Sequence, residues 1–232
     1  MLRSPLLAAL VVSTAALAGP PAKKGDPKPD TRAETWPAYV EGEALAALKL
    51  KGDAKRGQEA YEVCVACHLA SGAGRSDGTF PQLAGQHSSV IIKQVADIRS
   101  QLRENPVMHP FSKTLVNPQE LADVAAFIAT LPIPRDNQKG PGTDVAHGRK
   151  LYERDCASCH GQNGEGNAAK VYPVLAGQHY KYLLREAKNL RDGKRKNGNP
   201  DMLKVIKAYG DKDIDAIADY MSRLETPSHP QK

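Results

Sequence analysis

The sequence predicts an all-helical fold of two tandem domains, and three observations support that prediction. A five-residue motif occurs twice, as CVACH from Cys64 and as CASCH from Cys156. The stretches that follow the two copies match one another, which indicates an internal repeat. Apolar residues recur at helical spacing, for example along residues 88–103, and no segment shows the alternation that is typical of a strand.

The expected helices lie at matching places in the two halves. Residues 57–67 and 148–159 should each form a helix that leads into a motif, and residues 88–103 a further helix of the first half. In residues 117–120 an asparagine N-cap precedes a proline and a capping-box glutamate, so the last helix of the first half should begin there. Asp211 is the expected start of the last helix of the second half.

The repeat continues well beyond the motif. A shift of 92 positions places FPQLAGQH, which begins at Phe80, on YPVLAGQH, which begins at Tyr172. After a two-residue insertion, NPVM ending at Met108 matches NPDM ending at Met202. A stretch rich in proline, glycine and polar residues separates the halves and is typical of a linker.

The N-terminal residues predict export. Arg3 precedes an apolar run over residues 5–17, and Ala16-Leu17-Ala18 at its end is a small-x-small cleavage pattern. We expect a secretory signal peptide that is cleaved after Ala18. An uncleaved membrane anchor is the alternative, but the run is about 13 residues long, short of the ~20 needed to span a bilayer.

The expected organisation follows from these features. It comprises a signal peptide over residues 1–18, a flexible Pro/Lys-rich leader over 19–50, a first domain over 51–134, a linker over 135–147, a second domain over 148–226 and a tail over 227–232.

Composition narrows the functional classes. The formal net charge of +6 is modest, and no stretch pairs clustered arginines with stacking aromatics, so we expect no nucleic-acid partner. Aromatic residues make up only 5% of the chain, so each small core needs other apolar material to fill it. The basic stretch 181–196 is either a docking face for an acidic partner or a solvated helix face.

All four cysteines belong to the two motifs, which leaves three interpretations to weigh. A disulfide does not explain a histidine directly after each pair, and the spacing does not suit one shared zinc site. C-x-x-C-H is the signature of covalent haem attachment. The two thiols form thioether bonds to the haem vinyl groups, and the histidine that follows binds the iron. The motifs therefore predict one haem on Cys64, Cys67 and His68, and a second on Cys156, Cys159 and His160.

Methionines are the candidates for the opposite iron ligand. Met108 and Met202 occupy matching places in the repeat, whereas Met221 has Ile128 as its counterpart and is expected in the core. A thioether is a soft, neutral ligand that favours Fe(II) and raises the reduction potential. His87 and His179 also match one another, but a helix-start or surface role suits them better than ligation.

Taken together, these motifs resemble the dihaem cytochrome c4 group, in which each half is similar to a class I cytochrome c domain. The resemblance rests on the paired CxxCH motifs, the P-x-L-A-G-Q and N-x-x-M segments and the final helix. It implies two covalently bound haem c groups, and backbone carbonyls of Pro81 and Pro173 that accept a hydrogen bond from Nδ1 of each ligating histidine. Leu69 departs from the pattern, because most haem motifs have glycine there, as Gly161 does.

The resemblance also implies a function. It is one-electron transfer in the periplasm between a quinol-oxidising complex and a terminal oxidase or reductase, without catalysis by the protein itself. Loose association with the membrane stays open, as does the oligomeric state. The alternatives are a dihaem enzyme, either a peroxidase or a thiosulfate-oxidising cytochrome, and a cytochrome subunit of a larger oxidoreductase. A peroxidase needs an open iron position, and thiosulfate enzymes often use a cysteine ligand, for which this chain has no spare cysteine.

Overall fold

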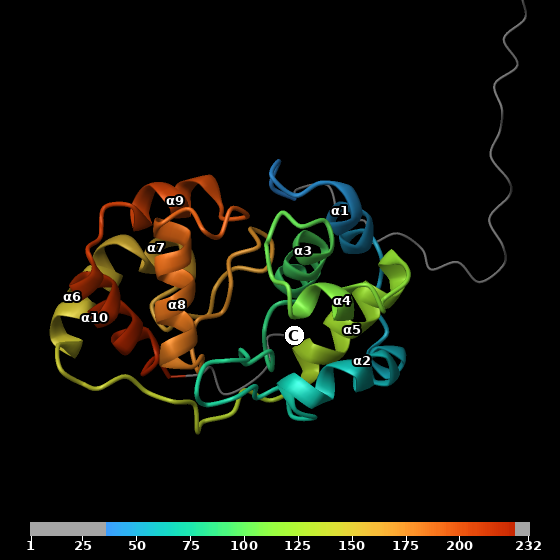
Figure 1. Cartoon of the computed structure of the whole chain (residues 1–232), viewed down its shortest axis with the longest axis horizontal. Helices are drawn as coiled ribbons and strands as arrows, with labels where there is room; N and C mark the ends of the chain where they lie inside the picture. The colour runs from blue at the N-terminus through green and yellow to red at the C-terminus, as the bar shows by residue number, and fades with distance from the viewer. Residues whose placement is uncertain (1–35, 226–232) are drawn as a thin grey trace, which may run out of the picture.

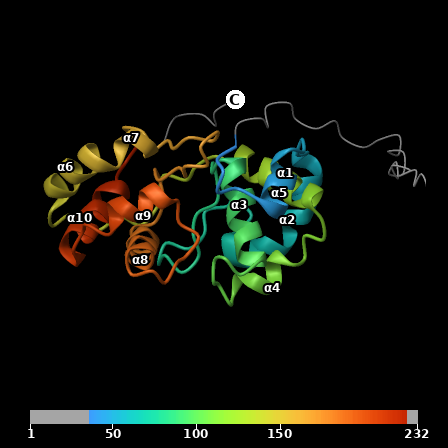
Figure 2. The same ribbon diagram turned by 90° about the horizontal axis from the view of Figure 1, so that it is seen from above.

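The computed structural model describes residues 36–225, so the predicted signal peptide and the 227–232 tail lie outside the described residues. The described chain forms two helical units side by side, joined by a linker that runs along one edge (Figures 1 and 2). The helices of the first unit are α1 (Gly42–Leu48), α2 (Ala54–His68), α3 (Ser88–Arg99), α4 (Met108–Ser112) and α5 (Pro118–Thr130). Those of the second unit are α6 (Val145–Asp155), α7 (Ala157–His160), α8 (Tyr180–Arg191), α9 (Pro200–Ile206) and α10 (Asp211–Met221).

The predicted all-helical class is confirmed. Between residues 36 and 225 the only β-type pairing is an isolated bridge between Asn167 and Tyr172. Within this same stretch, no helix combines the length and the apolar character that a bilayer crossing requires. Asn117 caps α5 as expected, since its side chain accepts a hydrogen bond from the Glu120 backbone N–H. Asp211 is the first residue of α10.

Each unit is organised around one close helix crossing. A Cβ atom added to Gly57 would lie 1.9 Å from the carbonyl oxygen of Asp123, and one added to Gly148 would lie 1.9 Å from that of Ala216. Only glycine allows the backbones of α2 and α5, or of α6 and α10, to approach this closely. An aromatic pair packs at each crossing, with ring centroids 5.2 and 5.4 Å apart: Tyr61 with Phe127, and Tyr152 with Tyr220.

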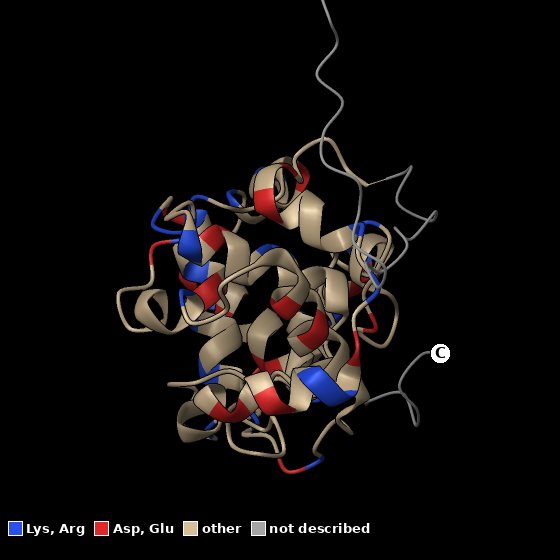
Figure 3. Ribbon diagram, turned by 90° about the vertical axis from the view of Figure 1, so that its right-hand side faces the viewer, with Lys and Arg blue, Asp and Glu red and all other residues tan. Residues whose placement is uncertain are grey.

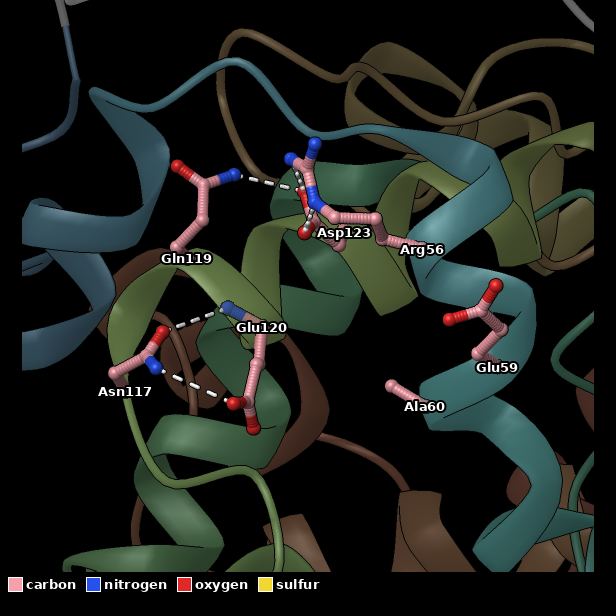
Figure 4. A pocket seen from close by; sticks show the side chains of 7 residues that line it. All are labelled: Arg56, Glu59, Ala60, Asn117, Gln119, Glu120 and Asp123. Atoms are coloured by element: carbon pink, nitrogen blue, oxygen red, sulfur yellow. Dashed lines mark hydrogen bonds and ion pairs between the residues drawn. The ribbon is translucent and has the colours of Figure 1, made fainter. Parts of the chain in front are cut away.

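The buried carboxylate of Asp123 on α5 forms hydrogen bonds to the start of α2 (Figure 4). The Asp123 side chain is 3% exposed and accepts hydrogen bonds from Nε of Arg56 and Nε2 of Gln119, both at 2.7 Å. It also accepts from the backbone N–H of Asp53, the N-cap of α2. The polar hollow drawn in Figure 4 lies beside the N-terminal half of α2, whereas the haem motif occupies its C-terminal end.

The prediction of a flexible leader up to residue 50 is wrong for residues 36–50. This segment contains α1, whose Ala44 and Ala47 are buried against the core of the first unit. The hydroxyl of Tyr39 donates to the carbonyl of Lys170 in the second unit at 2.7 Å. The segment folds because its apolar side packs against α3 and α5. This contact joins residues far apart in the sequence, so the local sequence pattern does not predict it.

Two predicted helices differ in extent from the observed ones. The helix expected over 88–103 ends at Arg99, and Gln101 has a left-handed φ of 64°. The helix expected over 148–159 is interrupted at Cys156, between α6 and α7. The second unit has one more residue than the first between its crossing glycine and its motif, and this extra residue interrupts the helix.

Three basic side chains of the stretch 181–196 contact the first unit. Arg185 donates to the carbonyl of Gly78 at 2.7 Å, and Lys196 pairs with Glu104 at 2.8 Å. Arg195 is also directed to the first unit, where Oε1 of Gln94 accepts its hydrogen bond at 2.9 Å. The side chains of Lys181, Arg185, Lys194 and Lys196 are nevertheless exposed, as the solvated-face interpretation predicts, and the docking face stays a prediction. Basic and acidic residues are interspersed along the helices seen in Figure 3.

Candidate haem-attachment sites

Each CxxCH motif lies at the C-terminal end of a helix, with its histidine turned into the unit. Cys64, Cys67 and His68 lie at the C-terminal end of α2. In the second unit Cys156 is the N-cap of α7, which contains Cys159 and His160. All four thiols are free and half-buried, so the disulfide alternative is not realised. Burial raises the pKa of Cys64 to about 11 and that of Cys156 to about 12. Both groups are therefore neutral thiols near pH 7.

The two ligand histidines are held in a single tautomer. Nδ1 of His68 lies 2.9 Å from the carbonyl oxygen of Pro81, and Nδ1 of His160 lies 3.1 Å from that of Pro173. These are the atom pairs that the resemblance implies. A carbonyl can only accept, so Nδ1 carries the hydrogen and Nε2 keeps its lone pair. Burial lowers the pKa of both imidazoles, which favours the neutral form that binds a metal.

These donors suit covalently attached haem. Each unit offers two free thiols one helical turn apart and one imidazole whose Nε2 has no hydrogen-bond partner among the described residues. Among residues 36–225 no group of three or more His, Cys, Asp or Glu side chains is arranged to hold a metal ion by itself. The donor set therefore matches a porphyrin iron that takes one protein nitrogen per unit on this side.

The candidate methionines occupy equivalent turns. Met108 begins α4, and the side chain of Asn105 accepts a hydrogen bond from its backbone N–H at 3.0 Å. Met202 lies in the first turn of α9, and Asn199 caps it in the same way at 3.4 Å. This explains why asparagine precedes each methionine by three residues. Met221 is 7% exposed within the second core, as expected for a packing residue.

Two arginines hold the methionine-bearing loops, a role that sequence reasoning missed. Nε of Arg99 donates to the carbonyl of Ser112, the last residue of α4, at 3.0 Å. Nη1 of Arg191 lies 3.5 Å from the carbonyl of Tyr209, which follows α9. Arg99 and Arg191 are equivalent in the repeat, and that match was the available signal.

His87 and His179 are the N-caps of α3 and α8, so the helix-start prediction is confirmed. The surface part of that prediction is wrong for His179, which is only 4% exposed. Both imidazoles make hydrogen bonds to the opposite unit, because the N-termini of α3 and α8 face the loops that follow the haem motifs.

The comparisons with known proteins agree with this geometry. A family model described as "Cytochrome c" matches residues 54–132 and 145–225. The thiosulfate dehydrogenase electron acceptor of Stutzerimonas stutzeri (strain A1501) is 32% identical over 82% of this chain and 94% of its own length. Cytochrome c4 of Azotobacter vinelandii is 33% identical over 75% of this chain and 90% of its own length. The crystal structure of reduced recombinant cytochrome c4 from Pseudomonas stutzeri aligns with a TM-score of 0.67 and 29% identity, over 75% of this chain and 100% of that one.

Proposed function

Because the chain belongs to the cytochrome c family, as a dihaem protein of the cytochrome c4 type with a covalent haem c in each of two domains, we propose that it is a periplasmic carrier of single electrons. It receives electrons from a respiratory or sulfur-oxidising enzyme and delivers them to a terminal oxidase or reductase. In the first unit His68 and Met108 would hold the haem iron, and in the second unit His160 and Met202 would do so.

The observation that carries this proposal is the matched pair of ligand loops. In both units a methionine follows the motif histidine at an equivalent place, capped by an asparagine and anchored by an arginine. Packing alone does not require methionine at both places, because methionine is an interchangeable filler of apolar space. An iron bound from both sides has no open position for a substrate, which favours a carrier over a peroxidase.

The residues of the chain then have two tasks beside the haem groups. The haem groups supply the one-electron chemistry when bound. Pro81 and Pro173 hold the Nδ1 hydrogen of each ligating imidazole, which fixes its orientation and raises its basicity. Arg99 and Arg191 hold the loops that carry the methionines, which would keep both loops in place in either redox state.

A relative favours one particular electron donor. The similar protein of Stutzerimonas stutzeri is named a thiosulfate dehydrogenase electron acceptor. We therefore propose a thiosulfate-oxidising enzyme as a donor beside the quinol-oxidising complex. The two candidate donors are distinguished by the rate at which each reduces the oxidised protein. One reaction contains thiosulfate dehydrogenase with thiosulfate, and the other contains a quinol-oxidising complex. Rapid reduction in the first reaction supports the thiosulfate-oxidising donor. If the purified protein oxidised thiosulfate without any partner enzyme, it would itself be a thiosulfate-oxidising enzyme and not a carrier.

A redox titration tests the ligand assignment. Met108→His and Met202→His should each lower the potential of the haem in the same unit, because imidazole donates more strongly than a thioether and axial ligands span roughly 0.8 V. Met221→Leu is the matched control, since Met221 packs in the core, and should change neither potential. If neither His variant shifts a potential, or if the wild-type iron readily binds cyanide or peroxide, the carrier proposal is wrong.

A further inference from the structure

The two units meet through a symmetric set of hydrogen bonds. Gln86 exchanges two bonds with the backbone of Val174, at 3.0 Å through its Nε2 and 2.9 Å through its Oε1. Gln178 does the same with the backbone of Gln82, at 2.9 and 3.0 Å. Gln86 and Gln178 are equivalent in the repeat, and their partners directly follow Pro81 and Pro173. Each unit therefore forms hydrogen bonds to the other unit directly beside the proline carbonyl that orients a ligating histidine.

The neighbouring histidines extend this symmetry. Nε2 of His179 lies 2.8 Å from the carbonyl oxygen of Ala73, and Nε2 of His87 lies 2.9 Å from that of Glu165. Because a carbonyl only accepts, Nε2 carries the hydrogen and donates it in both cases. Ala73 and Glu165 are also equivalent in the repeat.

The peptide units that accept these bonds also contact the ligating histidines. The Ala73–Gly74 peptide receives His179 at its oxygen, while its N–H, on Gly74, donates to the carbonyl of His68 at 3.0 Å. In the second unit, the N–H of Gly166 donates to the carbonyl of His160 at 2.8 Å. A single peptide plane thus connects an imidazole of one unit to the ligand residue of the other.

The same glycines pack against the proline carbonyls. A Cβ atom on Gly74 would lie 2.4 Å from the carbonyl oxygen of Pro81, and one on Gly166 would lie 2.6 Å from that of Pro173. Displacing the peptide plane therefore displaces the carbonyl that accepts the Nδ1 hydrogen of His68 or His160.

We infer that His179 and His87 are positioning residues that act across the domain boundary: His179 helps to set the potential of the haem at His68, and His87 that of the haem at His160. The physical link is the hydrogen bond at Nδ1. When its acceptor moves away, the imidazole becomes less basic and stabilises Fe(III) less, so the potential rises. The inference depends on haem attachment at the two motifs and is independent of the methionine assignment.

The two histidines are not equally held. Nδ1 of His179 accepts a further hydrogen bond, at 3.2 Å, from the backbone N–H of Gln138 in the linker. His87 has no such contact among the described residues, because the single linker lies beside His179. The imidazole of His87 is also less deeply buried than that of His179. We expect the larger effect from His179.

The test is a redox titration of the full-length holoprotein, followed by NMR with the methyl signals of each haem assigned. His179→Ala should raise the potential of the haem at His68 and leave that at His160 unchanged. His87→Ala should give the reverse, with a smaller shift. His179→Gln keeps an N–H donor and should restore part of the wild-type value, which also covers the case in which the alanine variant does not fold.

Lys196→Ala is the matched control. It removes an ion pair between the units, with Glu104, whose two side chains are exposed to solvent, and it should change neither potential. A shift confined to the variant's own unit, an equal shift of both haems, or no shift overturns the inference. Failure of the carrier proposal has a separate signature, because it would appear as cyanide binding to the wild-type protein whatever the histidine variants do.

Discussion

The two units build the same turn after the haem motif with different residues. Leu69 adopts φ 63° and ψ 157°, a region that strains any residue except glycine, and Gly161 adopts nearly the same angles in the second unit. A Cβ atom on Gly161 would lie 2.0 Å from the carboxyl carbon of Glu165, whereas Ala73 stands at the equivalent place in the first unit. The first unit therefore has the large side chain at the first position and the small one at the second, and the second unit has the reverse.

The shared hydrogen bonds explain why the turn persists despite the strain. The hydroxyl of Tyr61 donates to the carbonyl of Leu69 at 3.0 Å, and that of Tyr152 donates to the carbonyl of Gly161 at 2.8 Å. The same backbone turn, with the same tyrosine hydrogen bond, therefore forms with leucine in one unit and with glycine in the other. The comparison teaches that the two halves are equivalent in backbone function and differ in how their side chains fill the space.

The largest expected effect tests the equivalence of the helix crossings. Gly57→Ala and Gly148→Ala each force a methyl group onto a backbone carbonyl of the facing helix. Each should lower the free energy of unfolding by about 1–3 kcal/mol or more, because overpacking displaces the backbone. Urea denaturation of the two holoproteins measures the loss, and we expect it to be similar in both.

Gly210→Ala is the control for that experiment. Gly210 has φ −76°, and the nearest atom to its added Cβ would be Oδ2 of Asp213 at 3.8 Å. Its stability should stay within about 0.5 kcal/mol of wild type. A much smaller loss for Gly148→Ala than for Gly57→Ala would show that the two crossings are not equivalent.

An intermediate effect tests the exchanged side chains of the turn. Gly161→Leu should destabilise by about 1–3 kcal/mol, because it adds backbone strain and a collision with Glu165. Adding Glu165→Ala recreates the pair found in the first unit and should recover part of the loss. Leu69→Gly should relieve strain and raise the unfolding temperature slightly. If Leu69→Gly destabilises as strongly as Gly161→Leu, strain is not what separates the units.

The smallest effect concerns a cluster of three charged residues at the interface. Glu186 is the counterpart of Gln94 and binds two arginines, Arg103 at 2.8 Å and Arg195 at 3.1 Å. Burial alone would raise the pKa of Glu186, but the arginines hold it below its usual value of 4.5. Glu186 therefore stabilises the fold above pH 4.5, and this contribution disappears as the pH falls through the lower folded-state pKa.

Denaturation curves recorded between roughly pH 3 and 7 measure this dependence. Glu186→Gln makes the site resemble that of the first unit. It should lower the free energy of unfolding at neutral pH and make that free energy depend less on pH in the acid range. Glu104→Gln is the control, because the pKa of Glu104 is lowered by Lys196 in an exposed pair that solvent screens. An equal effect of the two variants would argue against a special role for burial.

Much of the fold and of the candidate site was predictable because its signals are local. The CxxCH spacing places Cys64, Cys67 and His68 on one helical turn, and the capping residues mark where α5 begins. The repeat added the match between Met108 and Met202. Whether these methionines bind iron stays a prediction.

The sequence by itself determined the two haem motifs, the all-helical class and the internal repeat, since these depend on residues within a few turns of one another or on direct matching. Only the tertiary structure decided that residues 36–50 fold onto the first unit and that His179 bonds to Ala73, 106 positions away. Contacts over such separations depend on how whole units pack, and no local spacing encodes them.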